Sequence, residues 1–274
     1  MLSVLSGILA RIVSNSYLNV FQKILTNQNN KPSVVNFYTY FGLTILCICL
    51  FPFFSLNFSN ELLTNFCIMG LLGALGNYYI IKALSIGELS SLAPINSYKP
   101  IVAMVIAFLY LKEIPSLFAL FGILLIIAGT YILHFGGKYN KSAVFYRVLA
   151  LIFSGSEAVF IKKIILLTNI PTSFALWAIS GLIFSLLFVI LSKHKFSLPS
   201  VKHLGLLILS VAIMQYSTNF VFSKINVSYA LALFQLSTLL SVFLGVNIFK
   251  EDGLKQKIAA SVVMIIGALI IILN

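Results

Sequence analysis

Apolar runs of about twenty residues recur along the whole 274-residue chain, separated by short polar or proline-containing breaks. Each run is long enough to cross a hydrocarbon core of roughly 30 Å as an α-helix. Only 9% of the residues are charged, against roughly 25% in soluble domains. The sequence therefore predicts an all-α membrane protein with ten transmembrane helices, at residues 3–25, 34–54, 61–82, 89–111, 115–135, 143–166, 173–192, 204–223, 228–249 and 256–273.

The connectors between these helices are short, so any chemistry is expected inside the bundle or at its mouths. The net charge of +12 comes from Lys and Arg scattered at helix ends and connectors, which indicates contact with a lipid bilayer and excludes the contiguous basic face of a nucleic-acid partner. The three cysteines lie inside apolar runs without metal-ligand spacing. We predict no metal site and no cofactor.

The chain carries an internal repeat. At a shift of 140, residues of the first helix recur in the sixth, and at a shift of 138 the pair Lys112-Glu113 recurs as Lys250-Glu251. The matches at the first shift are Ala10, Ile12, Ser14, Ser16, Lys23 and Ile24 with Ala150, Ile152, Ser154, Ser156, Lys163 and Ile164. The sequence thus predicts two five-helix halves, residues 1–137 and 138–274.

An odd number of helices in each half makes the second half enter the membrane from the opposite side. Such an inverted repeat is found in many secondary transporters, where two nearly equivalent packings let a midplane cavity open to alternate sides. We therefore expect a polar cavity at the interface of the halves.

Further motifs lie along the first half: Ala10 to Lys23, Tyr79-x3-Ala83-Leu84, Ala93-Pro94, Pro100, Leu111-Lys112-Glu113 and Gly122 to Gly129. The second half keeps Phe249-Lys250-Glu251 and Gly267 but has no proline in its ninth helix. Over nearly its whole length the chain resembles the EamA-type ten-helix members of the drug/metabolite transporter superfamily. The resemblance implies a cavity lined by the first, third, fourth, sixth, eighth and ninth helices, and carriage of amino acids, nucleotide precursors, drugs or similar metabolites.

Three ionisable residues, Arg11, Lys99 and Glu157, lie well inside predicted helices. Because a charge at the bilayer centre costs about 2.5–3.5 kcal/mol on insertion scales, such residues usually face the bundle interior and mark a pathway. Arg11 and Asn15 also belong to a polar stripe on the first helix with Asn19 and Gln22. The stripe either lines a substrate cavity or forms hydrogen bonds between helices.

Lys99 lies between Pro94 and Pro100, which remove backbone donors and predict an irregular helix. Asn96 shares its face. The ammonium group can hold a substrate carboxylate or phosphate as a point charge, or form a structural pair with Glu157. Burial favours the neutral form of Glu157 and would suit it to proton coupling, whereas Arg11 or Lys99 close by would keep it ionised.

Neutral polar residues on other helices complete the expected substrate site, or serve as hydrogen bonds between helices: Asn77, Tyr78, Gln215, Asn219 and Gln235. Glycines spaced by three, Gly70, Gly73 and Gly76, indicate close helix packing. We interpret Lys112-Glu113 and Lys250-Glu251 as structural clamps beside connectors.

The charge rule places the Lys-rich odd-numbered connectors in the cytoplasm and both termini outside, whereas the resemblance implies termini inside. The sequence leaves this orientation open, together with the choice between a monomer and a homodimer. We expect a multi-pass protein of a bacterial inner (plasma) membrane.

The predicted function is a secondary active transporter, an exporter or exchanger of a small polar metabolite such as an amino acid, with protons as a possible coupling ion. The alternative is an exporter of drugs or lipophilic cations, or a lipid flippase, of the same fold. An enzyme is not predicted, because His134, His194 and His203 are isolated from acidic clusters.

Overall fold

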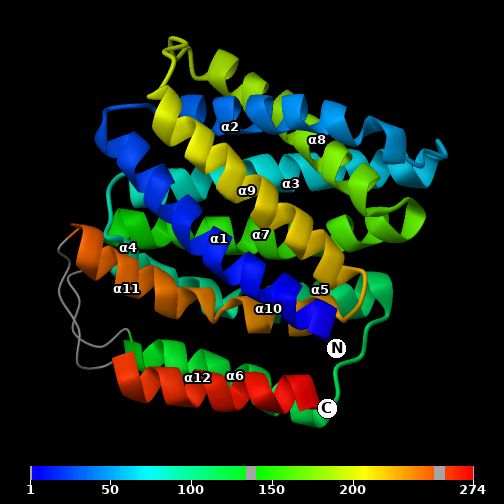
Figure 1. The fold of residues 1–274 in the computed structure, drawn as a ribbon, viewed down its shortest axis with the longest axis vertical. Coiled ribbons are helices and arrows are strands. Elements are labelled where there is room, and N and C mark those ends of the chain that lie inside the picture. Colours follow the sequence, from blue (N-terminus) through cyan, green and yellow to red (C-terminus); the bar gives the residue numbers. More distant parts are fainter. Residues whose placement is uncertain (1, 134–139, 250–256, 274) are drawn as a thin grey trace.

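The computed structural model describes residues 2–133, 140–249 and 257–273, and these residues form only helices and connectors (Figure 1). The first half contains α1 (Leu2–Asn27), α2 (Pro32–Cys47), η1 (Ile48–Phe53), α3 (Asn60–Leu84), α4 (Leu89–Leu92), η2 (Ala93–Tyr98), α5 (Lys99–Leu111) and α6 (Leu117–Leu133). The second contains α7 (Lys141–Leu167), α8 (Ile170–Leu191), α9 (Val201–Phe222), α10 (Val227–Phe234), α11 (Ser237–Phe249) and α12 (Lys257–Leu273). The expected boundary at 137/138 and the pair Lys250-Glu251 lie outside the described residues.

Seven helices or helix pairs of the described chain are long and apolar enough to cross a membrane. One of them, Val227–Gly245, runs through both α10 and α11. Shorter apolar helices occupy the other predicted spans, at Lys99–Leu111, Leu117–Ile132 and Val262–Ile271. Every span expected from hydropathy is therefore helical, and seven of them meet the length of a membrane crossing.

Local signals in the sequence start the helices. The Ser59 side chain accepts a hydrogen bond from the Leu62 N–H at 3.1 Å and caps α3. Asn169 caps α8 in the same way through the Thr172 N–H at 2.9 Å, with Pro171 in the first turn, where its missing N–H is harmless. These caps let connectors of a few residues reverse the chain.

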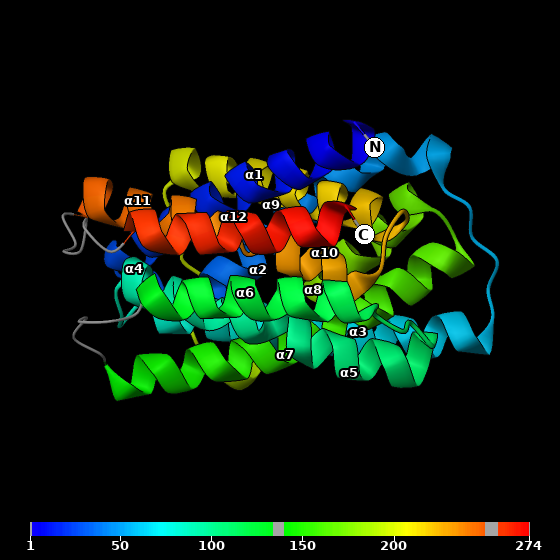
Figure 2. The same ribbon diagram turned by 90° about the horizontal axis from the view of Figure 1, so that it is seen from below.

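The helices pack in pairs that relate the two halves. Helix α1 packs on α9 as α7 packs on α3, and α1 contacts α11 as α7 contacts α5. The pairs α2 with α8 and α6 with α12 each join one half to the other. Exchanging the halves thus converts each contact into another observed contact. The two termini lie near each other at one end of the bundle (Figures 1 and 2).

Close packing at glycines holds several of these pairs together. A methyl group at Gly122 of α6 would lie 2.7 Å from the Gly267 carbonyl oxygen of α12, and one at Gly267 would lie 2.6 Å from that of Gly122. Methyl groups at Gly70, Gly73 and Gly76 of α3 would meet side chains of α7 and α8. The prediction that the α3 glycines serve close helix packing is confirmed.

The fourth predicted span is interrupted, as its prolines predicted. The 3₁₀-helix η2 separates α4 from α5, and Pro100 stands in the first turn of α5, where the chain resumes α-helical geometry.

The ninth predicted span is also interrupted, although it has no proline. The backbone N–H of Gln235 bonds the Ala232 carbonyl at 3.0 Å, one residue short of the α-helical partner. The Gln235 side-chain amide donates to that partner, the Leu231 carbonyl, at 2.8 Å. Because the side chain satisfies the carbonyl that the bend releases, the helix can break without proline.

Candidate functional site

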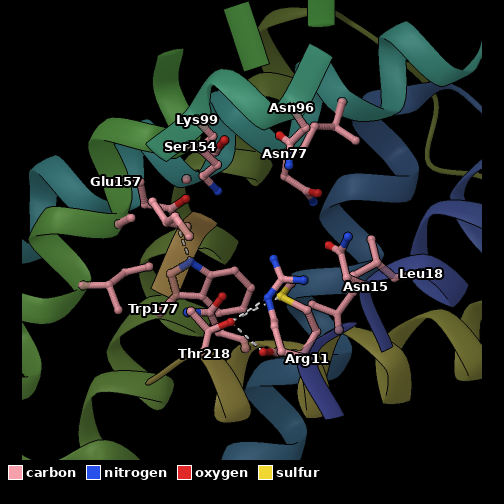
Figure 3. A pocket seen from close by; sticks show the side chains of 18 of the residues that line it. Arg11, Asn15, Leu18, Asn77, Asn96, Lys99, Ser154, Glu157, Trp177 and Thr218 are labelled. Atoms are coloured by element: carbon pink, nitrogen blue, oxygen red, sulfur yellow. Dashed lines mark hydrogen bonds between the residues drawn. The ribbon is translucent and has the colours of Figure 1, made fainter. Parts of the chain in front are cut away.

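A cavity of about 90 Å³ lies inside the bundle (Figure 3). Its polar lining includes seven of the ten residues that the sequence singled out: Arg11, Asn15, Asn77, Asn96, Lys99, Glu157 and Gln215. The wall comes from α1, α2, α3, η2, α5, α7, α8, α9 and α10. The second and seventh predicted spans, α2 and α8, therefore join the six that the family resemblance implied.

Three of the expected residues lie behind the cavity wall. Tyr78 stacks at an angle against Phe188, with ring centroids 5.9 Å apart. The side-chain amides of Asn219 and Gln215 approach each other to 2.8 Å, so Asn219 supports Gln215. Gln235 spans the helix interruption described above. The described cavity lining therefore does not include these three residues, and their part in substrate binding stays a prediction.

Arg11 is held by two groups and keeps one nitrogen free of protein partners. Its Nε donates to Thr218 Oγ1 at 2.8 Å, and its Cζ lies 5.0 Å from the centre of the Phe234 ring. Its Nη1 is buried without a hydrogen-bond partner among the described residues. In Figure 3 the guanidinium extends from α1 toward the middle of the cavity.

The polar stripe of α1 combines both roles that the sequence left open. Asn15 lines the cavity and also donates to Ser237 Oγ at 3.0 Å. Gln22 donates to Asn77 Oδ1 at 3.1 Å, and Asn77 donates to Asn36. The stripe therefore lines the cavity and connects α1 with α2, α3 and α11.

Glu157 lies on α7 opposite Arg11 and is only 8% exposed. The indole Nε1 of Trp177 donates to Glu157 Oε1 at 2.5 Å, and Lys99 faces the same carboxylate closely enough for the two charges to interact (Figure 3). A side chain at Gly73 would collide with Oε1, so the glycine makes room for the carboxylate. Glu157 thus has a fixed position between a neutral donor and a cation.

The two helix interruptions meet at the cavity. Asn96 of η2 lines the cavity and donates to Gln235 Oε1 at 3.2 Å. The irregular segments of the two halves are therefore linked directly, and their polar groups are satisfied by each other rather than by lipid.

Arg147 is the main residue that sequence reasoning misassigned. As one of the Lys and Arg residues at helix ends, it is expected to flank the membrane. Instead it is 6% exposed, lines the cavity and donates from Nε to the Leu92 carbonyl at 3.2 Å. The sequence does not mark its depth, because Arg147 stands close to the start of the predicted helix 143–166. Trp177 and Tyr40 also line the cavity, and nothing in the sequence separates them from the many lipid-facing aromatic residues.

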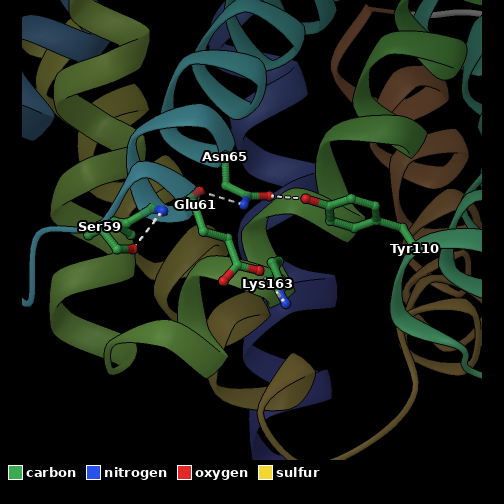
Figure 4. A network of polar contacts seen from close by, with 6 residues as sticks. Ser59, Glu61, Asn65, Tyr110 and Lys163 are labelled. Atoms are coloured by element: carbon green, nitrogen blue, oxygen red, sulfur yellow. Dashed lines mark hydrogen bonds and ion pairs between the residues drawn. The ribbon is translucent and has the colours of Figure 1, made fainter.

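The predicted clamp at Glu113 is confirmed. Its carboxylate accepts from the Val227 N–H at 2.9 Å and pairs with Lys162 at 2.5 Å, which joins the α5–α6 connector to the second half. A second polar group lies at the same end (Figure 4): Glu61 pairs with Lys163 at 2.7 Å, and Asn65 accepts from Tyr110 Oη at 3.0 Å. The contacts of Glu113 and Glu61 tie the two halves together away from the cavity, and the contact of Asn65 with Tyr110 joins α3 to α5 within the first half.

Comparison with known proteins adds three findings. The model of the EamA-like transporter family matches this chain twice, at residues 2–135 and 141–273. No curated protein matches the sequence. A solved structure, described only as the crystal structure of a protein, aligns over 99% of this chain and 96% of its own, with a TM-score of 0.74 and 14% identity. At that identity the likeness shows the fold alone.

Proposed function

This chain belongs to the EamA-like transporter family, and we propose that it is a secondary active transporter that exports or exchanges a small polar metabolite, such as an amino acid, across a bacterial inner membrane. Membership of the family makes it a multi-pass membrane transporter. The energy source, direction and substrate are our inferences from the site.

The proposed architecture is ten membrane spans arranged as two inverted repeats, residues 1–137 and 138–274. The paired helix contacts support this architecture, because each contact has an observed counterpart when the two halves are exchanged. The interruptions at η2 and between α10 and α11 fall in corresponding spans of the two repeats. Broken helices in corresponding positions of inverted repeats commonly form the substrate site of transporters, which work by rocking one repeat against the other.

The observation that carries the proposal is the polar cavity where these interruptions meet. Polar groups inside a bundle of apolar helices are expensive and mark a pathway. The cavity is far smaller than the roughly 300–1,000 Å³ pockets that hold drug-sized ligands. Its size and polarity therefore favour a small polar solute over a drug.

We assign direct substrate contact to the lining residues, other than Glu157, that carry a charge or an amide group: Arg11, Asn15, Asn19, Asn77, Asn96, Lys99, Arg147 and Gln215. Asn219 and Gln235 contact Gln215 and Asn96, and we assign to them the positioning of these two side chains. Glu157 is the proposed proton-coupling residue, because it is the single carboxylate among the described lining residues.

Transport by the purified protein in proteoliposomes tests this function. Vesicles loaded with unlabelled amino acids or organic acids should accumulate the same labelled compound by exchange, and Arg11→Gln should reduce the initial rate at least tenfold. Lys224→Gln, which removes an exposed charge away from the cavity, is the control and should transport normally. The proposal would be contradicted if, for every compound, vesicles without the protein accumulated as much label as vesicles that contain it.

A further inference from the structure

The charges that face the cavity do not balance. Its described lining contains three cationic side chains, Arg11, Lys99 and Arg147, but one carboxylate, Glu157. Arg11 and Arg147 are 8% and 6% exposed, so water screens them little. Because an uncompensated charge in a low-dielectric interior is costly, this excess of two positive charges favours a negatively charged occupant.

Three buried polar atoms in the same wall lack a partner among the described residues. They are Arg11 Nη1, Tyr40 Oη and Ser154 Oγ, and all three side chains line the cavity. Each can donate a hydrogen bond, and buried polar groups in native proteins are nearly always satisfied. The three residues come from α1, α2 and α7 and belong to the wall of one cavity, and donors left unsatisfied there fit oxygen acceptors of a ligand.

Glu157 is occupied by protein groups, so it does not offer a site for a cationic ligand. Trp177 donates to it at 2.5 Å and Lys99 supplies a positive charge beside it. A lipophilic cation in the cavity would meet the charges of Arg11 and Arg147 without a free counter-charge. The arrangement disfavours cationic drugs.

We propose that the site binds a compact doubly negative metabolite, a small dicarboxylate or phosphomonoester, with Arg11 and Arg147 as its main charge partners. This assignment rests on the proposed function and narrows its substrate from polar metabolites in general to dianions. The guanidinium groups of both arginines are already oriented through Nε, by Thr218 and by the Leu92 carbonyl. Fixing each fork in this way prepares its terminal nitrogens for the bidentate contacts that carboxylate and phosphate oxygens accept.

The test is thermal stabilisation of the purified full-length protein at constant ionic strength. Succinate and glycerol 3-phosphate are the dianionic probes, and succinamide and glycerol are their neutral counterparts. Alanine represents a zwitterion and tetraphenylphosphonium a lipophilic cation. We expect saturable stabilisation by at least one dianion and none by its neutral counterpart, since a ligand that binds only the folded state raises its stability. Comparison of the two dianions distinguishes the carboxylate from the phosphate class.

Variants locate the binding. Arg11→Gln should weaken binding of the stabilising dianion at least tenfold, and Arg11→Lys should retain part of it because the charge remains. Arg147→Gln removes the other proposed charge partner and should weaken binding to a similar extent, so it provides a second charge deletion should Arg11→Gln fail to fold. Lys202→Gln, an exposed lysine outside the cavity, is the matched control and should bind normally.

The assignment would be overturned if neither dianion stabilised the protein, whether or not alanine or tetraphenylphosphonium did. Unchanged dianion binding in both charge deletions would also overturn it. Failure of the transporter proposal would look different. Dianion binding without exchange in vesicles would support the anion site and contradict transport. Exchange of neutral amino acids without dianion binding would support transport and contradict the anion site.

Discussion

In the proposed mechanism, Glu157 is the residue at which substrate binding and proton binding meet. A dianion held by Arg11 places negative charge opposite the Glu157 carboxylate, and this charge favours protonation of Glu157. The other titratable groups that face this carboxylate are Lys99 from α5 and Tyr40 from α2. Because binding energies are reciprocal, protonation of Glu157 must also tighten dianion binding.

We therefore expect dianion binding to take up a proton from solution, and dianion affinity to rise as the pH falls through the range in which Glu157 titrates. Calorimetry in two buffers of different ionisation enthalpy measures this uptake, at a pH where the ligand is fully ionised. Glu157→Gln should abolish the uptake and the pH dependence. Glu61→Gln, at an ion pair on the end of the bundle, is the control. Unchanged proton uptake in Glu157→Gln would assign the coupling to another group.

The sequence predicts a site residue only where the residue type is unusual for its place in the chain. Arg11, Lys99 and Glu157 stand out because a charge within an apolar run is costly and persists only where it meets a pathway or a buried partner. Arg147 does not, because distance from a helix start is a poor measure of depth when the helix extends beyond the bilayer. Trp177 has no polar neighbour in the sequence, and its hydrogen bond to Glu157 arises only when α7 and α8 pack together.

At the scale of helices, the close contact between Gly122 and Gly267 predicts that a larger side chain at either position destabilises the packing of α6 on α12. Gly122→Ala places a methyl group 2.7 Å from a carbonyl oxygen and should force α6 away from α12. We expect a loss of about 1–3 kcal/mol in the free energy of unfolding, the usual range for overpacking. Gly205→Ala on α9 has open space and should be neutral or gain roughly 0.5–1 kcal/mol from helix propensity. Unfolding by sodium dodecyl sulfate in mixed micelles compares the variants, and equal stability of the two would contradict this packing.

The broken ninth span makes a second prediction at this scale. Gln235→Ala removes the donor to the Leu231 carbonyl and the acceptor of Asn96, so it should cost about 1–3 kcal/mol, the range for a buried group left unsatisfied. Asn96→Ala should cost less, and the double variant should cost less than the sum, because the two changes remove one shared bond. The same unfolding measurement checks the cycle, with exposed Gln28→Ala as control. Additive effects would show that the hydrogen bond between Asn96 of η2 and Gln235 carries no energy.

This interruption also marks the limit of prediction for the elements. Hydropathy located every helical span, and Pro94 and Pro100 predicted the break at η2, since proline removes a backbone donor wherever it stands. The break after Phe234 has no such local cause. It depends on a glutamine side chain replacing a backbone donor and on Asn96 from the other half, so only the folded structure reveals it.

At the scale of the whole molecule, the two ends of the bundle carry different charge. The end with the odd-numbered connectors holds exposed lysines at both sides of the α8–α9 connector, including Lys193, Lys195 and Lys202. At the opposite end, Lys162 and Lys163 are engaged by Glu113 and Glu61, which leaves Lys112 and Lys224 as the exposed lysines there. Free lysines are attracted to the anionic cytoplasmic leaflet. The structure therefore favours the orientation given by the charge rule over the one implied by the family resemblance.

We accordingly predict that the odd-numbered connectors face the cytoplasm and that both termini face outward. Single cysteines in a background without Cys47, Cys49 and Cys67 test this orientation. Ser55→Cys, in the connector before α3, should react with a membrane-impermeant maleimide in intact cells, because that connector lies at the same end as the termini. Ser197→Cys, in the connector between α8 and α9, should react only after permeabilisation. Both serines are exposed, so the side of the membrane and not burial in the protein decides whether the reagent reaches them. The reverse labelling pattern would place the termini inside and the Lys-rich end of the bundle at the cell exterior.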